Sequence, residues 1–244
     1  MAQTSVCDPR WPKLNQRRAS LLLTKSMETS ANTFYHRNLP HWHPSGRSIF
    51  LTWRLYGSLP KSVINQLRAI RHQLTKRKTV AAGWTADNRI IEYKRLFAKV
   101  DAILDRAKTG PLWLKQTEIA DLVQQALLER YAHLYTLWSY VVMANHLHVF
   151  LKPKGESTIG SITKYLKGYA ARQANSFLQR TGQPFWQDES FDHWSRDRAE
   201  FFRVVEYIEN NPIKAGLVEK PEDWLWSSAA ERKRRGLEDF EALT

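Results

Sequence analysis

The chain has 244 residues, of which 43% are hydrophobic and 12% aromatic, and this composition excludes a disordered protein. The formal net charge of +13 predicts a polyanionic partner, and nucleic acid is the first candidate. The single cysteine excludes an intramolecular disulfide framework, and no apolar run reaches the roughly 18 residues of a membrane span. A cytoplasmic protein with no membrane partner is therefore expected.

The first half of the chain predicts an arm, one strand and several helices. Residues 1–45 mix Pro, Ser, Thr, Asn and Arg without a sustained period, which predicts a flexible arm. A β-rich run at 49–55 ends in a Gly-Ser-Leu-Pro turn and predicts a strand. Apolar residues then recur at helical spacing over 61–78, over 88–106 and again after residue 116.

The second half predicts a hairpin followed by two helices. Aromatic and β-branched residues fill 135–153, with an interruption at Ala144 and Asn145, which predicts two adjacent antiparallel strands. Helices are expected at 159–180 and at 201–210. The order of elements predicts an α+β domain over 46–230, with an antiparallel sheet, helices packed on one face, and a basic and acidic tail at 231–244.

Two histidines, His146 and His148, flank one leucine in the second strand of this hairpin. Side chains alternate along a strand, so both imidazoles share one face and could converge on a divalent metal ion. Hydrogen-bonded core histidines are the alternative. Tyr169 and Gln173, four residues apart on the 159–180 helix, also share a face and could approach the pair. A core aromatic and a backbone-capping amide are the alternatives for these two residues.

Basic residues are concentrated between positions 61 and 100, where ten Lys or Arg face two acids. Such a local excess favours a surface that binds a phosphate backbone, although a solvated helix face is the alternative. The basic residues that we expect to contact DNA lie on the helices at 61–78 and 159–180: Arg71, Lys76, Arg77, Lys164, Lys167 and Arg172.

Four blocks within residues 39 to 230 resemble, in the same order, blocks of the REP-associated tyrosine transposases. They are "LPHWHPSGRSIFLTWRLYGSLP", "VVMANHLHVFLKP", "LKGYAARQANSFLQRTGQPFWQDESFDHWSRD" and "YIENNPIKAGLVEKPEDWLWSSA". That family belongs to the HUH single-strand transposases, named for a His-hydrophobic-His pair.

The resemblance implies a ferredoxin-like fold of the HUH endonuclease type that acts on single-stranded or hairpin DNA. His146 and His148 would hold Mg²⁺ or Mn²⁺, and a tyrosine would attack the scissile phosphate to give a 5′-phosphotyrosine and a free 3′-hydroxyl. The wider superfamily is usually dimeric, so a homodimer fits the resemblance.

The resemblance leaves the nucleophile open. Relatives often have a tyrosine between the Trp-Gln and Asp-His of "WQDESFDH", where this chain has Asp-Glu-Ser-Phe. In the insertion-sequence branch of the superfamily, the nucleophile lies four residues before a glutamine metal ligand. Tyr169 and Gln173 match that spacing and are the predicted nucleophile and third ligand, with Tyr165 in reserve.

The block that lacks this tyrosine also contains Asp192 and His193. These residues could orient the DNA or could have a structural role. Because the expected tyrosine is missing, a non-catalytic nucleic-acid-binding descendant of such an enzyme is the alternative function.

Overall fold

The computed structural model describes residues 33–36, 40–43, 46–77, 86–188 and 190–244. A four-stranded antiparallel sheet lies at its centre, with the strands in the spatial order β4-β5-β3-β6. These strands are β3 (Ile49–Arg54), β4 (Tyr135–Val142), β5 (His146–Pro153) and β6 (Phe191–Trp194). The strands β1 (Thr33–His36) and β2 (Pro40–His43) form a separate two-stranded sheet.

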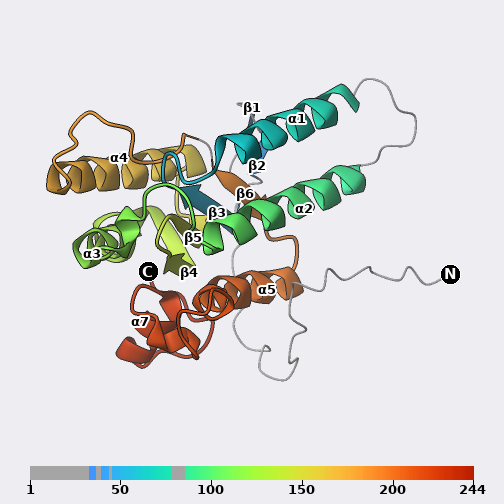
Figure 1. Cartoon of the computed structure of the whole chain (residues 1–244). Coiled ribbons are helices and arrows are strands. Elements are labelled where there is room, and N and C mark those ends of the chain that lie inside the picture. The colour runs from blue at the N-terminus through green and yellow to red at the C-terminus, as the bar shows by residue number, and fades with distance from the viewer. Residues whose placement is uncertain (1–32, 37–39, 44–45, 78–85, 189) are drawn as a thin grey trace.

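Helices connect the strands in the order that a ferredoxin-like fold requires (Figure 1). They are α1 (Lys61–Arg77), α2 (Ala86–Asp105), α3 (Thr117–Gln125), α4 (Ile159–Phe177), α5 (Arg198–Glu209), α6 (Asn211–Lys214) and α7 (Ser228–Arg235). The α+β class, the hairpin and the antiparallel sheet are therefore confirmed. In the part of the chain that the structure describes, no helix is long and apolar enough to cross a membrane.

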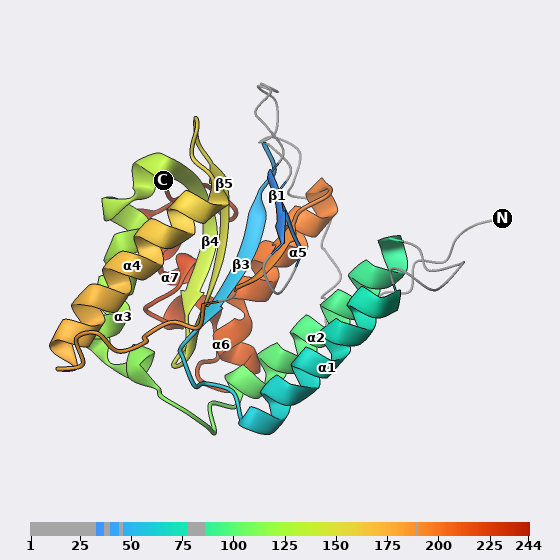
Figure 2. The same cartoon turned by 90° about the horizontal axis from the view of Figure 1, so that it is seen from above.

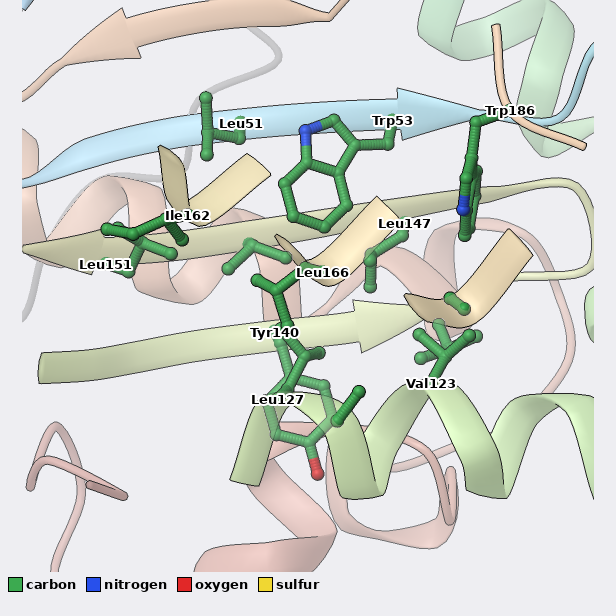
Figure 3. Close-up of a cluster of buried hydrophobic side chains, with 14 of the residues drawn as sticks. Leu51, Trp53, Val123, Leu127, Tyr140, Leu147, Leu151, Ile162, Leu166 and Trp186 are labelled. Atoms are coloured by element: carbon green, nitrogen blue, oxygen red, sulfur yellow. The ribbon is translucent and has the colours of Figure 1, made fainter. Parts of the chain in front are cut away.

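One face of the sheet is covered by α3 and α4 (Figure 2). Leu147 and Leu151 of β5 point to this side and pack near Ile162 and Leu166 of α4, as Figure 3 shows. Because alternate residues of a strand point to opposite faces, this packing leaves the even-numbered residues of β5 for the other side.

The opposite face is covered by α2 and α5, with α1 beside α2 (Figure 2). Its core contains Phe50 and Phe150 of the sheet, Phe97 of α2 and Val205 of α5, all buried. The prediction that helices pack on one face only was therefore wrong. Both faces of the central strands are apolar, so the sequence pattern could not show how many helical layers the sheet carries.

The C-terminal residues are part of this folded unit and not a tail at 231–244. Leu243 is buried in the core beside α3 and α4, and its amide donates to Leu137 O of β4 at 2.9 Å. The side chain of Arg235 donates to Leu243 O at 2.9 Å. At the other end, β1 and β2 fall inside the segment expected to be a flexible arm, and residues 1–32 lie outside the described residues.

A carboxylate near the start of α5 connects three elements. Glu200 is buried, and its Oε1 accepts from Lys94 Nζ of α2 at 2.8 Å and from His193 Nε2 of β6 at 2.7 Å. Its Oε2 accepts from the backbone amide of Arg196 at 3.0 Å. Burial alone would raise the pKa of Glu200, but His193 and Lys94 hold it far below the ordinary value of 4.5.

We expect the Glu200 network to make the fold sensitive to acid. Because the pKa of Glu200 is lower in the folded state, the unfolded chain binds the proton more readily, and stability falls as pH drops below 4.5. Glu200→Gln should lower the free energy of unfolding by about 2 kcal/mol at neutral pH and flatten its acid limb. Denaturant unfolding between pH 7 and about pH 3 measures both effects. The exposed control Glu156→Gln should keep the wild-type profile, and an unchanged acid limb in Glu200→Gln would contradict the assignment.

Candidate metal centre

The two histidines of β5 lie on the face covered by α2 and α5, and both are fully buried. Their ring centroids are 4.8 Å apart, and His148 stacks on Phe50 of β3 at 5.5 Å. The alternation of β5 explains this placement, because Leu147 between them occupies the core on the α4 side. The structure thus brings the two imidazoles together, as the spacing predicts.

Hydrogen bonds at the Nδ1 atoms orient both rings. Asn145 donates its side-chain amide to Leu104 O at 3.2 Å, so its Oδ1 is left to accept from His146 Nδ1 at 2.7 Å. His148 Nδ1 lies 2.8 Å from the hydroxyl of Thr52 on β3. In this arrangement each Nε2 can present a lone pair to the same point, as in histidines that ligate metals.

A carboxylate of α2 completes a three-residue cluster. Asp101 Oδ1 lies 3.1 Å from His148 Nε2 and 4.0 Å from His146 Nε2, and one ligand atom from each residue falls within 4.8 Å of the others. Within the described residues, all three atoms are buried, and none has a hydrogen-bond partner outside the cluster. Two imidazole nitrogens and a carboxylate oxygen that converge in a buried site form a donor set that suits a divalent metal ion.

The protonation state of His146 supports a metal site. Burial and the neighbouring His148 lower the pKa of His146 to about 3, so its ring is neutral and able to ligate. Burial alone would raise the pKa of Asp101, but the imidazole of His148 holds it well below its usual range. Asp105, one turn further along α2, behaves differently, because burial and the charge of Asp101 raise its pKa.

A tyrosine from α5 reaches the cluster. The hydroxyl of Tyr207 donates to Asp101 Oδ2, and its ring centroid lies 5.8 Å from that of His148. Tyr207 is half-buried, so its ring lies between the buried cluster and the surface. Asp101 therefore contacts the histidines through one oxygen and the phenol through the other.

Two polar residues of α6 follow Tyr207 in the chain. Lys214 Nζ lies 2.6 Å from Asp105 Oδ2 and 3.3 Å from Asp101 Oδ2. Asn211 is fully buried, and in the described part of the chain its side-chain oxygen and nitrogen have no hydrogen-bond partner. It lies four residues after Tyr207, at the start of α6.

The tyrosine predicted from the sequence lies elsewhere. Tyr169 packs edge-on against Tyr131 and beneath the guanidinium of Arg130, on the α4 side of the sheet. Gln173 and Tyr165 of α4 are exposed. The sheet thus separates α4 from the histidine side chains, and the structure does not bring Tyr169 or Gln173 to the histidines of the same chain.

The structure describes the side chains of three of the six predicted DNA-binding residues. Lys164 and Arg172 are exposed on α4, whereas Lys167 donates to Gln187 O at 2.6 Å. The three basic residues of the first helix belong to α1, but their side chains lie outside the described residues: Arg71, Lys76 and Arg77.

The block around β6 forms core and ion-pair contacts. His193 is bonded to Glu200, and Asp192 is buried. Phe191 packs in the core, with its ring centroid 5.6 Å from that of Phe97.

Sequence reasoning missed Asp101 and Tyr207. Asp101 lies on a helix with other charges of both signs, and its burial depends on the packing of α2 on the sheet. A signal did exist for Tyr207, because Tyr207 and Asn211 have the same four-residue spacing as Tyr169 and Gln173.

Comparison with known proteins agrees with the sequence blocks. Residues 115–211 match the family described as "Transposase IS200 like". The chain is 24% identical over 160 residues to the REP-associated tyrosine transposase of Escherichia coli K12, covering 60% of this chain and 87% of that protein. It is 28% identical over 96 residues to a putative REP-associated tyrosine transposase of Haemophilus influenzae, covering 36% of this chain and 54% of that one.

A solved structure is also similar. A REP-associated tyrosine transposase bound to a REP hairpin matches with a TM-score of 0.42 and 18% identity, over 88% of this chain and 92% of that chain.

Proposed function

We propose that the chain is a tyrosine transposase that cleaves and rejoins single-stranded DNA with Tyr207 as the nucleophile. The match of residues 115–211 to the IS200-like transposases and the similarity to a REP-associated tyrosine transposase support this proposal. The observation that carries this proposal is the hydrogen bond from the Tyr207 hydroxyl to Asp101, beside two histidines whose Nε2 atoms converge on the same carboxylate. Covalent catalysis requires a nucleophile and charge-stabilising groups within contact of one phosphate.

Each residue of the cluster has a role that follows from its position. His146, His148 and Asp101 would hold the metal ion, Mg²⁺ or Mn²⁺, which when bound supplies Lewis acidity that offsets the charge on the phosphate oxygens. Asp101 also positions the nucleophile, because its Oδ2 accepts the phenolic proton while its Oδ1 faces the imidazoles.

The reaction balances in atoms and charge. The phenolic oxygen of Tyr207 forms a bond to phosphorus while the bond from phosphorus to the 3′ oxygen breaks. The phenolic proton leaves toward Asp101 Oδ2 and passes on to solvent, and the departing 3′ oxygen takes up a proton from solvent. The product is a 5′-phosphotyrosine, which keeps the phosphodiester energy available for rejoining to another 3′-hydroxyl.

The partner is expected to be single-stranded DNA with a hairpin. The net charge of +13 supports a nucleic-acid partner, and the similarity to a REP-associated tyrosine transposase supports DNA. The exposed Lys164 and Arg172, together with Arg71, Lys76 and Arg77, remain our proposed backbone contacts. A homodimer and a cytoplasmic location remain predictions.

A covalent-adduct assay tests this function. We expect the purified protein to form an adduct with a 5′-extended hairpin oligonucleotide in Mn²⁺, visible on a denaturing gel and abolished by EDTA. Peptide mapping should place the nucleotide on Tyr207. Mapping to Tyr169 would restore the prediction made from the sequence. Binding of the oligonucleotide without any adduct would instead favour the non-catalytic alternative.

A further inference from the structure

Lys214 is a cation at the edge of the metal centre, and it has no role in the reaction proposed above. Its Nζ lies 2.6 Å from Asp105 Oδ2, 3.3 Å from Asp101 Oδ2 and 5.4 Å from the ring centroid of Tyr207. The Lys214 side chain is 44% exposed, whereas the side chains of Asp101 and Asp105 are 0% and 8% exposed. Lys214 therefore connects the buried acids to solvent.

The charges around Lys214 make its position dependent on a second cation. Without a metal, two buried neighbouring carboxylates need a positive charge, and the ammonium group of Lys214 supplies it. A divalent ion at Asp101 Oδ1 would neutralise the same carboxylate and would repel the ammonium held on Oδ2. Lysine has a long flexible stem and a compact charge, so it can turn outward without disturbing α6.

We propose that Lys214 is an exchangeable counter-ion: it balances the acidic pair while the centre is empty of metal, and turns to a DNA phosphate when a divalent cation takes over. This inference rests on the proposed function, because it assumes that His146, His148 and Asp101 hold the cation. Tyr207 is half-buried beside Lys214, and a scissile phosphate would have to reach its hydroxyl. A released ammonium group there would contact that phosphate as a point charge.

Metal affinity is the first readout, because a merely structural lysine would not oppose metal binding. Mn²⁺ titration of the metal-free protein, followed by EPR of the free ion, should show that Lys214→Met binds Mn²⁺ about tenfold more tightly than wild type. Lys214→Arg keeps the charge and should bind like wild type. Lys220→Met, which removes an exposed lysine six residues further along the chain, is the matched control and should stay within about twofold.

DNA affinity in the same variants is the second readout. In a Tyr207→Phe background that prevents cleavage, Lys214→Met should weaken binding of the hairpin oligonucleotide about tenfold in Mn²⁺. Without metal, the loss should be smaller, because Lys214 is then engaged with the acids.

A measurement on the wild-type protein avoids any folding defect of the variants. Labelling with an amine-reactive reagent, read by mass spectrometry, should modify Lys214 several-fold faster after Mn²⁺ is added, with Lys220 unchanged. Equal or weaker Mn²⁺ affinity in Lys214→Met, or labelling of Lys214 that does not increase, would overturn the exchange while leaving the metal centre intact. If neither the wild-type protein nor Lys214→Met binds Mn²⁺, the proposed metal centre is wrong, and the exchange with it.

Discussion

Tyr207→Phe is expected to abolish the covalent adduct and to slow cleavage of a single-stranded hairpin by about 10⁴-fold or more, because the attacking oxygen is removed. The side chain keeps its shape, so the ring should still pack beside His148 and Phe50. The lost hydrogen bond to Asp101 should have little effect on folding, because Lys214 still contacts that carboxylate. Single-turnover cleavage on denaturing gels measures the rate, and thermal unfolding checks the fold.

The matched controls for this variant are tyrosines of α4. Tyr169→Phe and Tyr165→Phe remove the same hydroxyl from the far side of the sheet, and both should cleave at close to the wild-type rate. Full activity in Tyr207→Phe together with loss in Tyr169→Phe would reverse the assignment. It would also imply that a second subunit or a rearrangement brings α4 to the histidines.

Replacing either histidine of β5 should have the second largest effect. His146→Ala and His148→Ala should each weaken Mn²⁺ binding by at least about 100-fold, because even groups that only orient a metal ligand contribute 10- to 100-fold. Cleavage should fall in parallel and recover only partly at high Mn²⁺. Calorimetric Mn²⁺ titration measures the affinity without reference to activity.

Both histidines are fully buried, so stability must be measured beside affinity. Each alanine leaves a cavity between the sheet and α2, and some loss of melting temperature is expected. The exposed His133→Ala is the control and should change neither quantity. If the two β5 variants fold and still bind Mn²⁺ like wild type, the centre lies elsewhere.

Several parts of the fold could be predicted locally because their signals are local. The alternation in 135–153 defines the hairpin of β4 and β5, and the apolar spacing of 159–180 defines α4. The number of helical layers that pack on the sheet could not be predicted from such local patterns. Leu147 and Phe150 point to opposite faces and both are buried, so the pattern is apolar on both sides. It carried no information on which helix covers which face.

The candidate site shows the same division between local and long-range information. The amino-acid sequence by itself determined that His146 and His148 share a face, because a strand repeats every two residues whatever packs on it. Only the tertiary structure decided that this face belongs to α2 and α5, which brings Asp101, Tyr207 and Lys214 to the imidazoles and leaves Tyr169 across the sheet. The physical reason is that these contacts join helices far apart in the chain. Their burial is determined by packing on the sheet, and no periodicity within a single helix records it.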